Sequence, residues 1–201
     1  MSSLFFFCGH AGAGKTTLAK RVLSTYLNEQ RSFCFLDKDT LYGNYSAEVM
    51  GVLTGDPDDR DSPLYLKHLR DPEYRGLLDT ARENIALGVN AIVVGPLSQE
   101  VRNHILMDAN WLNVSSDTQV KVVWVHVQEA EAHRRIIARN DARDAYKLAH
   151  WHDYRTRLFM PTAVAYPELI FYDNTAPTEA QFSQLLGTLR GGLEGVENDV
   201  L

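Results

Sequence analysis

The pattern G-x-x-x-x-G-K-T, which residues 9–16 match, constrains the fold of this chain more than any other feature. An apolar run from Leu4 to Cys8 precedes it and has the composition of a buried strand, and a helical pattern begins directly after it. Glycines allow the backbone of such a turn to curl until its N–H groups face inward around an anion. A strand, a glycine-rich turn and a helix in this order predict a phosphate-binding P-loop.

The predicted loop offers both backbone and side-chain groups to a nucleoside triphosphate. The helix that begins near Gly14 adds the positive end of its dipole. Lys15 can reach the β- and γ-phosphates, and the hydroxyl of Thr16 can coordinate Mg²⁺. From His10 we expect the backbone N–H, rather than the imidazole, to contribute. The predicted nucleotide contacts in this loop are Gly9, His10, Ala11, Gly12, Ala13, Gly14, Lys15, Thr16 and Thr17.

Length and charge limit the classes of protein that this chain can belong to. Its 201 residues suffice for one sizeable α/β domain. A net charge of −6 disfavours nucleic acid and anionic membranes as main partners, and no apolar run is long enough to span a bilayer. Cys8 and Cys34 lie in apolar runs and form no C-x-x-C pair, which is typical of buried thiols in a reducing compartment. We therefore expect a cytoplasmic protein, monomeric by default, with a small-molecule partner.

Strand-like and helical segments alternate along the chain at least five times. The later strand candidates, residues 33–36, 91–94, 120–127 and 169–172, are almost continuously apolar. Such strands indicate a parallel sheet with helices on both faces. Without a repeat or a linker, residues 1–190 are expected to form one domain, followed by a loose tail at 191–201. Helices are predicted at 14–28, at 71–88 with Asp71 as its cap and Pro72 next, at 98–108 with Ser98 as its cap, and at 129–139, 144–159 and 177–190.

Residues 40–71 show no clear periodicity. They contain several glycines and prolines and a dense group of charges at 56–61, which predicts a loop with short helices over the edge of the sheet. Long irregular insertions in compact domains are often functional. We expect residues 40–75 to cover the acceptor, and at least one of Tyr42, Arg60, Tyr65, Tyr74 and Arg75 to contact it.

Two carboxylates, Asp37 and Asp39, directly follow the second predicted strand. Ligands bind at the carboxyl end of open parallel sheets, which places both residues near the loop at 9–16. Phosphoryl transfer needs a carboxylate there to orient the acceptor hydroxyl, and oxygen ligands for Mg²⁺. The same residues also suit an ordinary turn. We expect Asp39 to be the base and Asp37 to be either the alternative base or a metal ligand beside Thr16.

Arginines recur at every fourth position at Arg135, Arg139 and Arg143. On a helix this spacing places the side chains in one row. Guanidinium groups pair with phosphate oxygens and offset the charge that develops in phosphoryl transfer. The row fits either a solvated basic face, with a Glu131–Arg135 pair, or a mobile lid over residues 129–150. We expect the lid, with Arg139 and Arg143 closing over the transferred group.

Taken together, these segments resemble the small P-loop kinases. The resemblance is carried by residues 9–17, by Leu36–Asp39 and by the arginine-rich stretch at 135–148, and it extends from residue 4 to about 185. The most similar groups are AAA-type ATP-binding proteins related to zeta toxin, gluconate kinase and adenylylsulfate kinase. The resemblance implies a three-layer P-loop NTPase fold with a five-stranded parallel sheet, an ATP·Mg²⁺ donor, a helical lid that brings Arg135 to the nucleotide, and a separate acceptor pocket. It also implies that the adenine ring rests near Asn174.

One departure from the wider P-loop pattern is that no acidic residue ends the strands at 91–94 and 120–127. This argues against a motor ATPase, and in the similar kinases the carboxylates after the second strand can hold the metal instead. We therefore expect a kinase that moves the γ-phosphoryl group of ATP to a hydroxyl of a small molecule. The alternatives are an ATP-binding regulatory protein without efficient transfer, a zeta-toxin-like nucleotide-sugar kinase, and a polynucleotide-end kinase, which the net charge disfavours.

Overall fold

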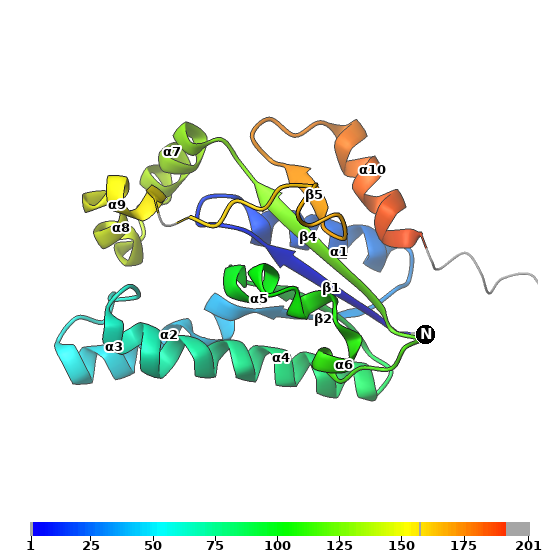
Figure 1. Cartoon of the computed structure of the whole chain (residues 1–201), viewed down its shortest axis with the longest axis horizontal. Helices are drawn as coiled ribbons and strands as arrows, with labels where there is room; N and C mark the ends of the chain where they lie inside the picture. The colour runs from blue at the N-terminus through cyan, green and yellow to red at the C-terminus, as the bar shows by residue number, and fades with distance from the viewer. Residues whose placement is uncertain (1, 157, 192–201) are drawn as a thin grey trace, which may run out of the picture.

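A five-stranded sheet forms the centre of the computed structural model, which describes residues 2–156 and 158–191 (Figure 1). The sheet order is β2-β3-β1-β4-β5, and all four pairings between neighbouring strands are parallel. The α/β fold and the five-stranded parallel sheet are therefore confirmed. The strands are β1 (Ser3–Cys8), β2 (Phe33–Asp37), β3 (Asn90–Val94), β4 (Gln119–His126) and β5 (Ile170–Asp173).

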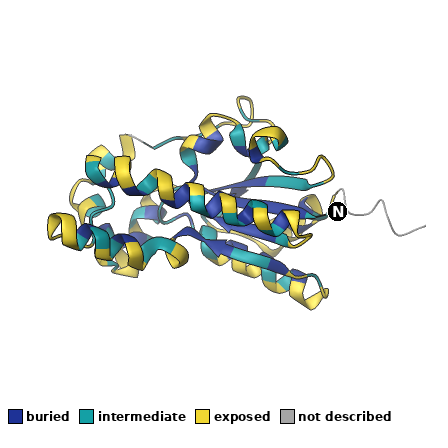
Figure 2. Ribbon diagram, turned by 90° about the horizontal axis from the view of Figure 1, so that it is seen from below, coloured by how far each residue is buried: buried dark blue, intermediate teal, exposed yellow. Residues whose placement is uncertain are grey.

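The central strand β1 explains why the sheet is covered on both sides. Every residue of β1 is buried, and successive side chains point to opposite faces. Phe6 packs among α4 (Asp71–Ala86), α5 (Ser98–Arg102) and α6 (Ala109–Leu112). Phe5 and Phe7 pack with α1 (Lys15–Asn28) and α10 (Glu179–Arg190) on the other face. Figure 2 shows the buried strands between helices whose outer faces are exposed, which confirms the three layers.

The structure corrects the interpretation of residues 40–71. Residues Lys38–Thr54 form one 17-residue helix, α2, which ends where Gly55 adopts a φ of 79°. The helix was missed because it has no apolar stripe: its buried residues are Lys38, Ser46 and Met50, while Tyr45, Val52 and Leu53 are exposed. Periodicity can only reveal a helix that buries one apolar face.

The helix predicted to begin at Asp71 begins earlier. Its first turn is α3 (Pro63–Tyr65), which Ser62 caps by accepting a hydrogen bond from the Tyr65 N–H at 3.2 Å. A π-helical stretch, η1 (Leu66–Arg70), then leads without a break into α4. Asp71 is therefore not a cap. Pro72 lacks an N–H and its ring crowds the preceding turn, and the wider π-helical turn before it accommodates both effects.

Other helix ends also differ from the prediction. Ser98 is the first residue of α5 rather than its cap, because Leu97 before it has a φ of 47° and gives no side-chain cap. A second positive φ at His104 breaks the predicted 98–108 helix, which continues as η2 (Ile105–Met107) and α6. α10 begins at Glu179, two residues after the expected start at 177, and Thr178 caps it through a capping box with Gln181.

The remaining helices gather beyond the carboxyl ends of the strands, at the end of the molecule away from the N-terminus (Figure 1). They are α7 (Glu129–Arg139), η3 (Ala142–Asp144), α8 (Ala145–Ala149) and α9 (Trp151–Thr156), so the helix predicted at 144–159 is a series of short pieces. The tail predicted at 191–201 lies outside the described residues except for Gly191. No helix in the described part of the chain is both long and apolar enough to cross a bilayer.

Candidate active site

A cavity of about 770 Å³ opens at the carboxyl ends of the strands. Its volume lies within the range of roughly 300–1,000 Å³ that is usual for small-molecule sites. The loop at 9–17, the end of β2, the turn after β3 and the helices from α7 to α9 all contribute to its wall. Segments that are far apart in the sequence therefore form one site.

Two glycines of the P-loop are required by close packing as well as by backbone conformation. Gly9 has a φ of +138°, and a Cβ there would lie 2.2 Å from the carbonyl oxygen of Val125 in β4. Gly12 has a φ of +77°, and a Cβ there would lie 2.7 Å from the carbonyl oxygen of Ala132 in α7. The loop is thus held between β4 and α7, in a conformation that larger residues could not adopt.

Lys15 lies at the floor of the cavity. Its ammonium group donates a hydrogen bond to the carbonyl oxygen of His10 at 2.8 Å, so it is turned toward the curve of the loop. Burial lowers the pKa of Lys15 to about 8, although the carboxylates of Asp39 and Asp37 oppose this shift. A desolvated ammonium group with one neutral acceptor is suited to bind an anionic phosphate.

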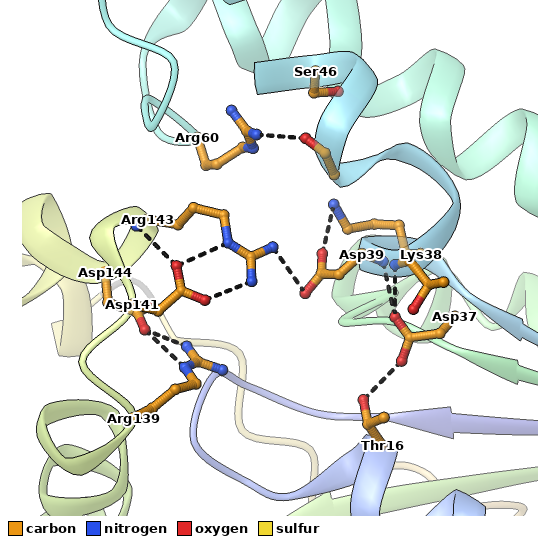
Figure 3. Close-up of polar contacts among 12 residues, drawn as sticks. Thr16, Asp37, Lys38, Asp39, Ser46, Arg60, Arg139, Asp141, Arg143 and Asp144 are labelled. Carbon is orange, nitrogen blue, oxygen red and sulfur yellow. Dashed lines mark hydrogen bonds and ion pairs between the residues drawn. The ribbon is translucent and has the colours of Figure 1, made fainter. Parts of the chain in front are cut away.

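Thr16 and Asp37 meet beside Lys15 (Figure 3). The Thr16 hydroxyl donates to one carboxylate oxygen of Asp37 at 2.7 Å. The other oxygen accepts from the backbone N–H groups of Asp39, at 2.9 Å, and Thr40, at 3.3 Å, and so caps α2. Mg²⁺ in nucleotide sites binds few protein oxygens besides phosphates and water. The Thr16 hydroxyl and the Asp37 carboxylate oxygen that it contacts fit that requirement, and the described residues hold no cluster of three or more His, Cys, Asp or Glu for a metal.

Asp39 occupies the first turn of α2 with its side chain facing the cavity. Its carboxylate lies 3.2 Å from the ammonium of Lys38 and 3.7 Å from the guanidinium of Arg143. Partial desolvation raises the pKa of Asp39, but these two cations outweigh it and the net pKa is lowered. Asp39 is therefore ionised at neutral pH. Both oxygens of Asp37 have partners within the protein, so Asp39 is the better placed of the two to accept a hydrogen bond from a ligand.

A buried polar network behind Asp39 was not foreseen from the sequence. Lys38, beside Asp39, forms an ion pair of 2.9 Å with Glu73 of α4, and both residues are buried. The Tyr65 hydroxyl donates to the same Glu73 oxygen at 2.8 Å, and the Ser46 hydroxyl donates to the other. Every member of this network comes from α2, α3 or α4. The network therefore fixes α2, and with it Asp39, against the rest of the fold.

The three arginines do not form one row on one helix, so that prediction is wrong. α7 ends at Arg139 because Asn140 adopts a φ of 51°, and Arg143 lies in η3. The turn nevertheless brings Arg143 toward the cavity, where it pairs with Asp141 at 2.6 Å and approaches Asp39 (Figure 3). Arg139 forms an ion pair with Asp144.

Arg135 has contacts with α7 itself, with the cavity and with the segment after β5. It forms the expected ion pair with Glu131, at 2.6 Å, and it also lines the cavity. Its guanidinium donates to the carbonyl oxygen of Asn174 at 2.8 Å. The Asn174 N–H donates to the carbonyl of His126 at 2.8 Å, and the Asn174 amide donates to the carbonyl of Ala13 at 2.7 Å. Asn174 therefore supports the P-loop from behind, and its backbone groups already have partners.

The imidazole of His10 is engaged within the protein. The ring nitrogen Nε2 donates to the carbonyl oxygen of Phe159, and the ring edge packs on Trp124 with centroids 5.3 Å apart. Burial lowers the pKa of His10, so the ring is neutral at neutral pH. His10 thus ties the P-loop to the segment that follows α9.

The structure brings most of the predicted site residues to the cavity wall. The exceptions are Gly9, Ala13 and Asn174, which lie behind it. Of the candidates at 40–75, Arg60, Tyr65 and Tyr74 line the cavity, while Tyr42 packs on Gly76 and Arg75 is exposed elsewhere. The predicted site residues that line the cavity are His10, Ala11, Gly12, Gly14, Lys15, Thr16, Thr17, Asp37, Asp39, Arg135, Arg139 and Arg143.

Four further basic residues line the cavity and were not identified from the sequence: Lys38, Arg70, Arg102 and Lys147. Arg102 could have been found, because α5 follows β3 and the carboxyl ends of parallel strands share one edge. Arg70 could not, since it lies in the π-helical stretch that the pattern did not reveal.

Comparison with known proteins agrees with this fold. No curated protein matches the chain. Among solved structures, a Chaetomium thermophilum Kti12 in complex with ADP-AlF3 has a TM-score of 0.62 at 16% identity, with 96% of this chain and 100% of that chain covered. The Mycobacterium tuberculosis APS kinase CysC in complex with AMPPNP and APS has a TM-score of 0.56 at 17% identity, covering 94% and 97%. A gluconokinase from Sinorhizobium meliloti has a TM-score of 0.53 at 13% identity, covering 96% and 91%.

These likenesses concern the fold. A family comparison identifies the chain at the level of sequence: the model of the AAA domain matches residues 4–161. The match contains the P-loop, the carboxylates after β2 and the arginines that line the cavity, and a P-loop domain implies nucleotide binding. The chain belongs to the AAA domain family.

Proposed function

We propose that this protein is an ATP- and Mg²⁺-dependent phosphotransferase that moves the γ-phosphoryl group to a hydroxyl of a small molecule. One observation carries the proposal: the P-loop lysine, a threonine–carboxylate pair suited to Mg²⁺, and an ionised aspartate line the same cavity. A site for ATP hydrolysis alone would need no further pocket beside the nucleotide. The cavity continues past Asp39 to Tyr65, Arg70 and Ser98, which provides space for an acceptor.

In this proposal each side chain has a defined role. Lys15 and the loop N–H groups bind the β- and γ-phosphates, and Thr16 and Asp37 hold Mg²⁺, which offsets phosphate charge when bound. The acceptor hydroxyl donates a hydrogen bond to Asp39 and its oxygen attacks the γ-phosphorus. The bond between that phosphorus and the β–γ bridging oxygen breaks, ADP leaves, and the hydroxyl proton passes to Asp39. Arg139 and Arg143 stabilise the charge on the transferred group.

Two ion pairs support a lid over residues 129–150. Lys147 of α8 lies 3.2 Å from Asp61, and Arg143 lies 3.7 Å from Asp39. Each pair joins this region to residues 40–75, the part of the chain that we propose covers the acceptor. Closure would exclude water, which otherwise competes with the acceptor for the phosphoryl group.

The test is phosphoryl transfer from γ-labelled ATP to a panel of hydroxyl-bearing metabolites, including nucleotide sugars. We expect at least one labelled product with the wild type, weak ATP binding by Lys15→Ala, and bound ATP with slow transfer by Asp39→Asn. Arg75→Gln, an exposed change outside the cavity, is the control and should behave as wild type. ATP binding without transfer to any acceptor would indicate a regulatory protein instead, and intact transfer in both Asp37→Asn and Asp39→Asn would reject the assignment of the base.

A further inference from the structure

We infer that the acceptor is an anionic molecule, and that Arg102 binds its carboxylate, phosphate or sulfate group at the β3 side of the cavity. The inference rests on the proposed function, because it names a class of acceptor for the same site. It is carried by the charge of the cavity and by the one arginine in its wall that lacks a polar partner among the described residues.

The cavity is basic although the chain is acidic. Nine lysines and arginines and four aspartates line its described wall, whereas the whole chain has a net charge of −6. The proposed function assigns part of this excess to the triphosphate, namely Lys15 and the arginines of α7 and η3. Beyond Asp39, Lys38 is neutralised by Glu73 at 2.9 Å, and Arg70 by Asp71 at 2.7 Å and Glu100 at 3.5 Å.

Arg102 is the exception among these cations. Within the part of the chain that the structure describes, its guanidinium has neither a carboxylate nor a hydrogen-bond acceptor as a partner. Its contact is with the ring of Phe159, 4.9 Å from the centroid. The backbone of Arg102 is held in place, since its carbonyl accepts a hydrogen bond from the Tyr166 hydroxyl at 3.3 Å. The Arg102 side chain is exposed, and its donors are unpaired within the described residues, which suits bidentate recognition of an anionic oxygen group.

The neighbours of Arg102 support a ligand contact. Ser98 and Gln99 of the same helix also line the cavity, and the spacing of four residues places Ser98 and Arg102 on one face. A hydroxyl and an amide beside the guanidinium supply further hydrogen bonds to an anion.

The place of β3 in the sheet sets the direction in which a bound molecule extends. β3 lies between β1, which leads into the P-loop, and β2, which leads to Asp37 and Asp39. A molecule anchored at Arg102, at the end of the helix that follows β3, can therefore present its hydroxyl group to Asp39 and the γ-phosphate. This arrangement would select acceptors by their charge at one end and by their hydroxyl group at the other.

Binding is measured first, because it does not require the natural acceptor. With Mg·AMP-PNP saturating the nucleotide end, the protein is titrated with inorganic sulfate, inorganic phosphate or acetate and followed by calorimetry or NMR. We expect wild type to bind at least one of these anions and Arg102→Gln to bind it at least tenfold more weakly. Arg75→Gln removes the same charge from an exposed position outside the cavity and should bind as wild type does. The preferred probe separates a carboxylate site from a phosphate or sulfate site.

Transfer is measured second, with matched acceptors: glycerol against glycerate and glycerol 3-phosphate, and glucitol against gluconate and glucitol 6-phosphate. We expect transfer to the anionic members, with a KM for the acceptor that rises at least tenfold in Arg102→Gln, well beyond any change in the KM for ATP. Equal efficiency with neutral acceptors would overturn the inference while leaving the proposed function intact. Wild-type affinity for the anions in Arg102→Gln, or no anion binding by wild type, would overturn it too. Anion binding at Arg102 without transfer to any compound would support the anion site and count against the proposed function.

Discussion

Arg143 extends its guanidinium to within 3.7 Å of the Asp39 carboxylate, and so joins the segment after α7 to the first turn of α2. The same guanidinium is held on its other side by Asp141, at 2.6 Å. A cation shared between two carboxylates is positioned before any ligand arrives. It can contact a phosphoryl group beside Asp39 without a large change of its own conformation.

The ion pair between Lys147 and Asp61 offers a way to test closure of this region without touching the reacting groups. Both side chains are mostly buried, and the pair is 3.2 Å long. We expect Lys147→Ala to raise hydrogen exchange in residues 129–156 and to raise ATP hydrolysis relative to transfer. Asp61→Asn should have the same effects, and a double-mutant cycle should give a coupling of about 1 kcal/mol. Unchanged exchange in both variants would show that the pair does not hold the region closed.

The affinity for ATP should depend on pH through Lys15. The pKa of Lys15 is lowered to about 8 by burial, and the anionic triphosphate favours the protonated amine. Affinity should therefore be constant well below pH 8 and fall above it, by up to about tenfold for each pH unit, with proton uptake on binding. Calorimetry between pH 7 and pH 9.5 measures this. Lys15→Met should bind weakly and lose the pH dependence; if it kept the dependence, another group would be responsible.

The buried pair between Lys38 and Glu73 should be important for stability. Glu73→Gln leaves the Lys38 ammonium buried with Asp39 as its remaining anionic neighbour. Breaking a buried pair from one side costs about 3–5 kcal/mol, and we expect a loss of about that size in the free energy of unfolding in urea. Glu83→Gln, an exposed change on the same helix α4, should alter stability by less than about 0.5 kcal/mol. Similar stability of the two variants would contradict this role for the pair.

Asp37 and Asp39 should be separable by experiment. Asp39→Asn should lower kcat by roughly 10²–10⁴. The fall in Tm should be small, because the side chain is 57% exposed and loses only its ion pairs with Lys38 and Arg143. Asp37→Asn keeps a cap for α2 but loses the charge beside Thr16, so it should raise the Mg²⁺ concentration needed for half-maximal activity. Asp37→Ala should in addition lower stability by about 1 kcal/mol. The opposite pattern, with Mg²⁺ dependence altered in Asp39→Asn, would exchange the two roles.

Much of the fold follows from local patterns that do not depend on context. Leu4–Cys8 is apolar along its whole length, which predicts a strand that is buried on both faces. Every residue of the observed strand β1 is buried. Gly9 and Gly12 predict a turn that other residues cannot form. In the structure both glycines pack closely against backbone carbonyl groups, Gly9 against β4 and Gly12 against α7. Asp37 could be placed near Thr16 because parallel strands end at a common edge, and the two are 2.7 Å apart.

The side of the cavity formed by α2 and by the segment after α7 was not predicted, for physical reasons. α2 buries a lysine and a serine rather than an apolar stripe, and burial of those groups is favourable only because Glu73 of a different helix satisfies them. The left-handed turn at Asn140 depends on one residue and removes Arg143 from the expected helix.

By itself, then, the sequence determined the parallel sheet, the P-loop and the carboxylates at its edge. Those features are dictated by side-chain burial along single segments and by backbone conformations that few residues can adopt. Tertiary structure alone decided which charges neutralise each other and which face the cavity. Whether Lys38, Arg70 or Arg102 is free to meet a ligand depends on the partner that packing brings to each, and such partners come from other parts of the chain.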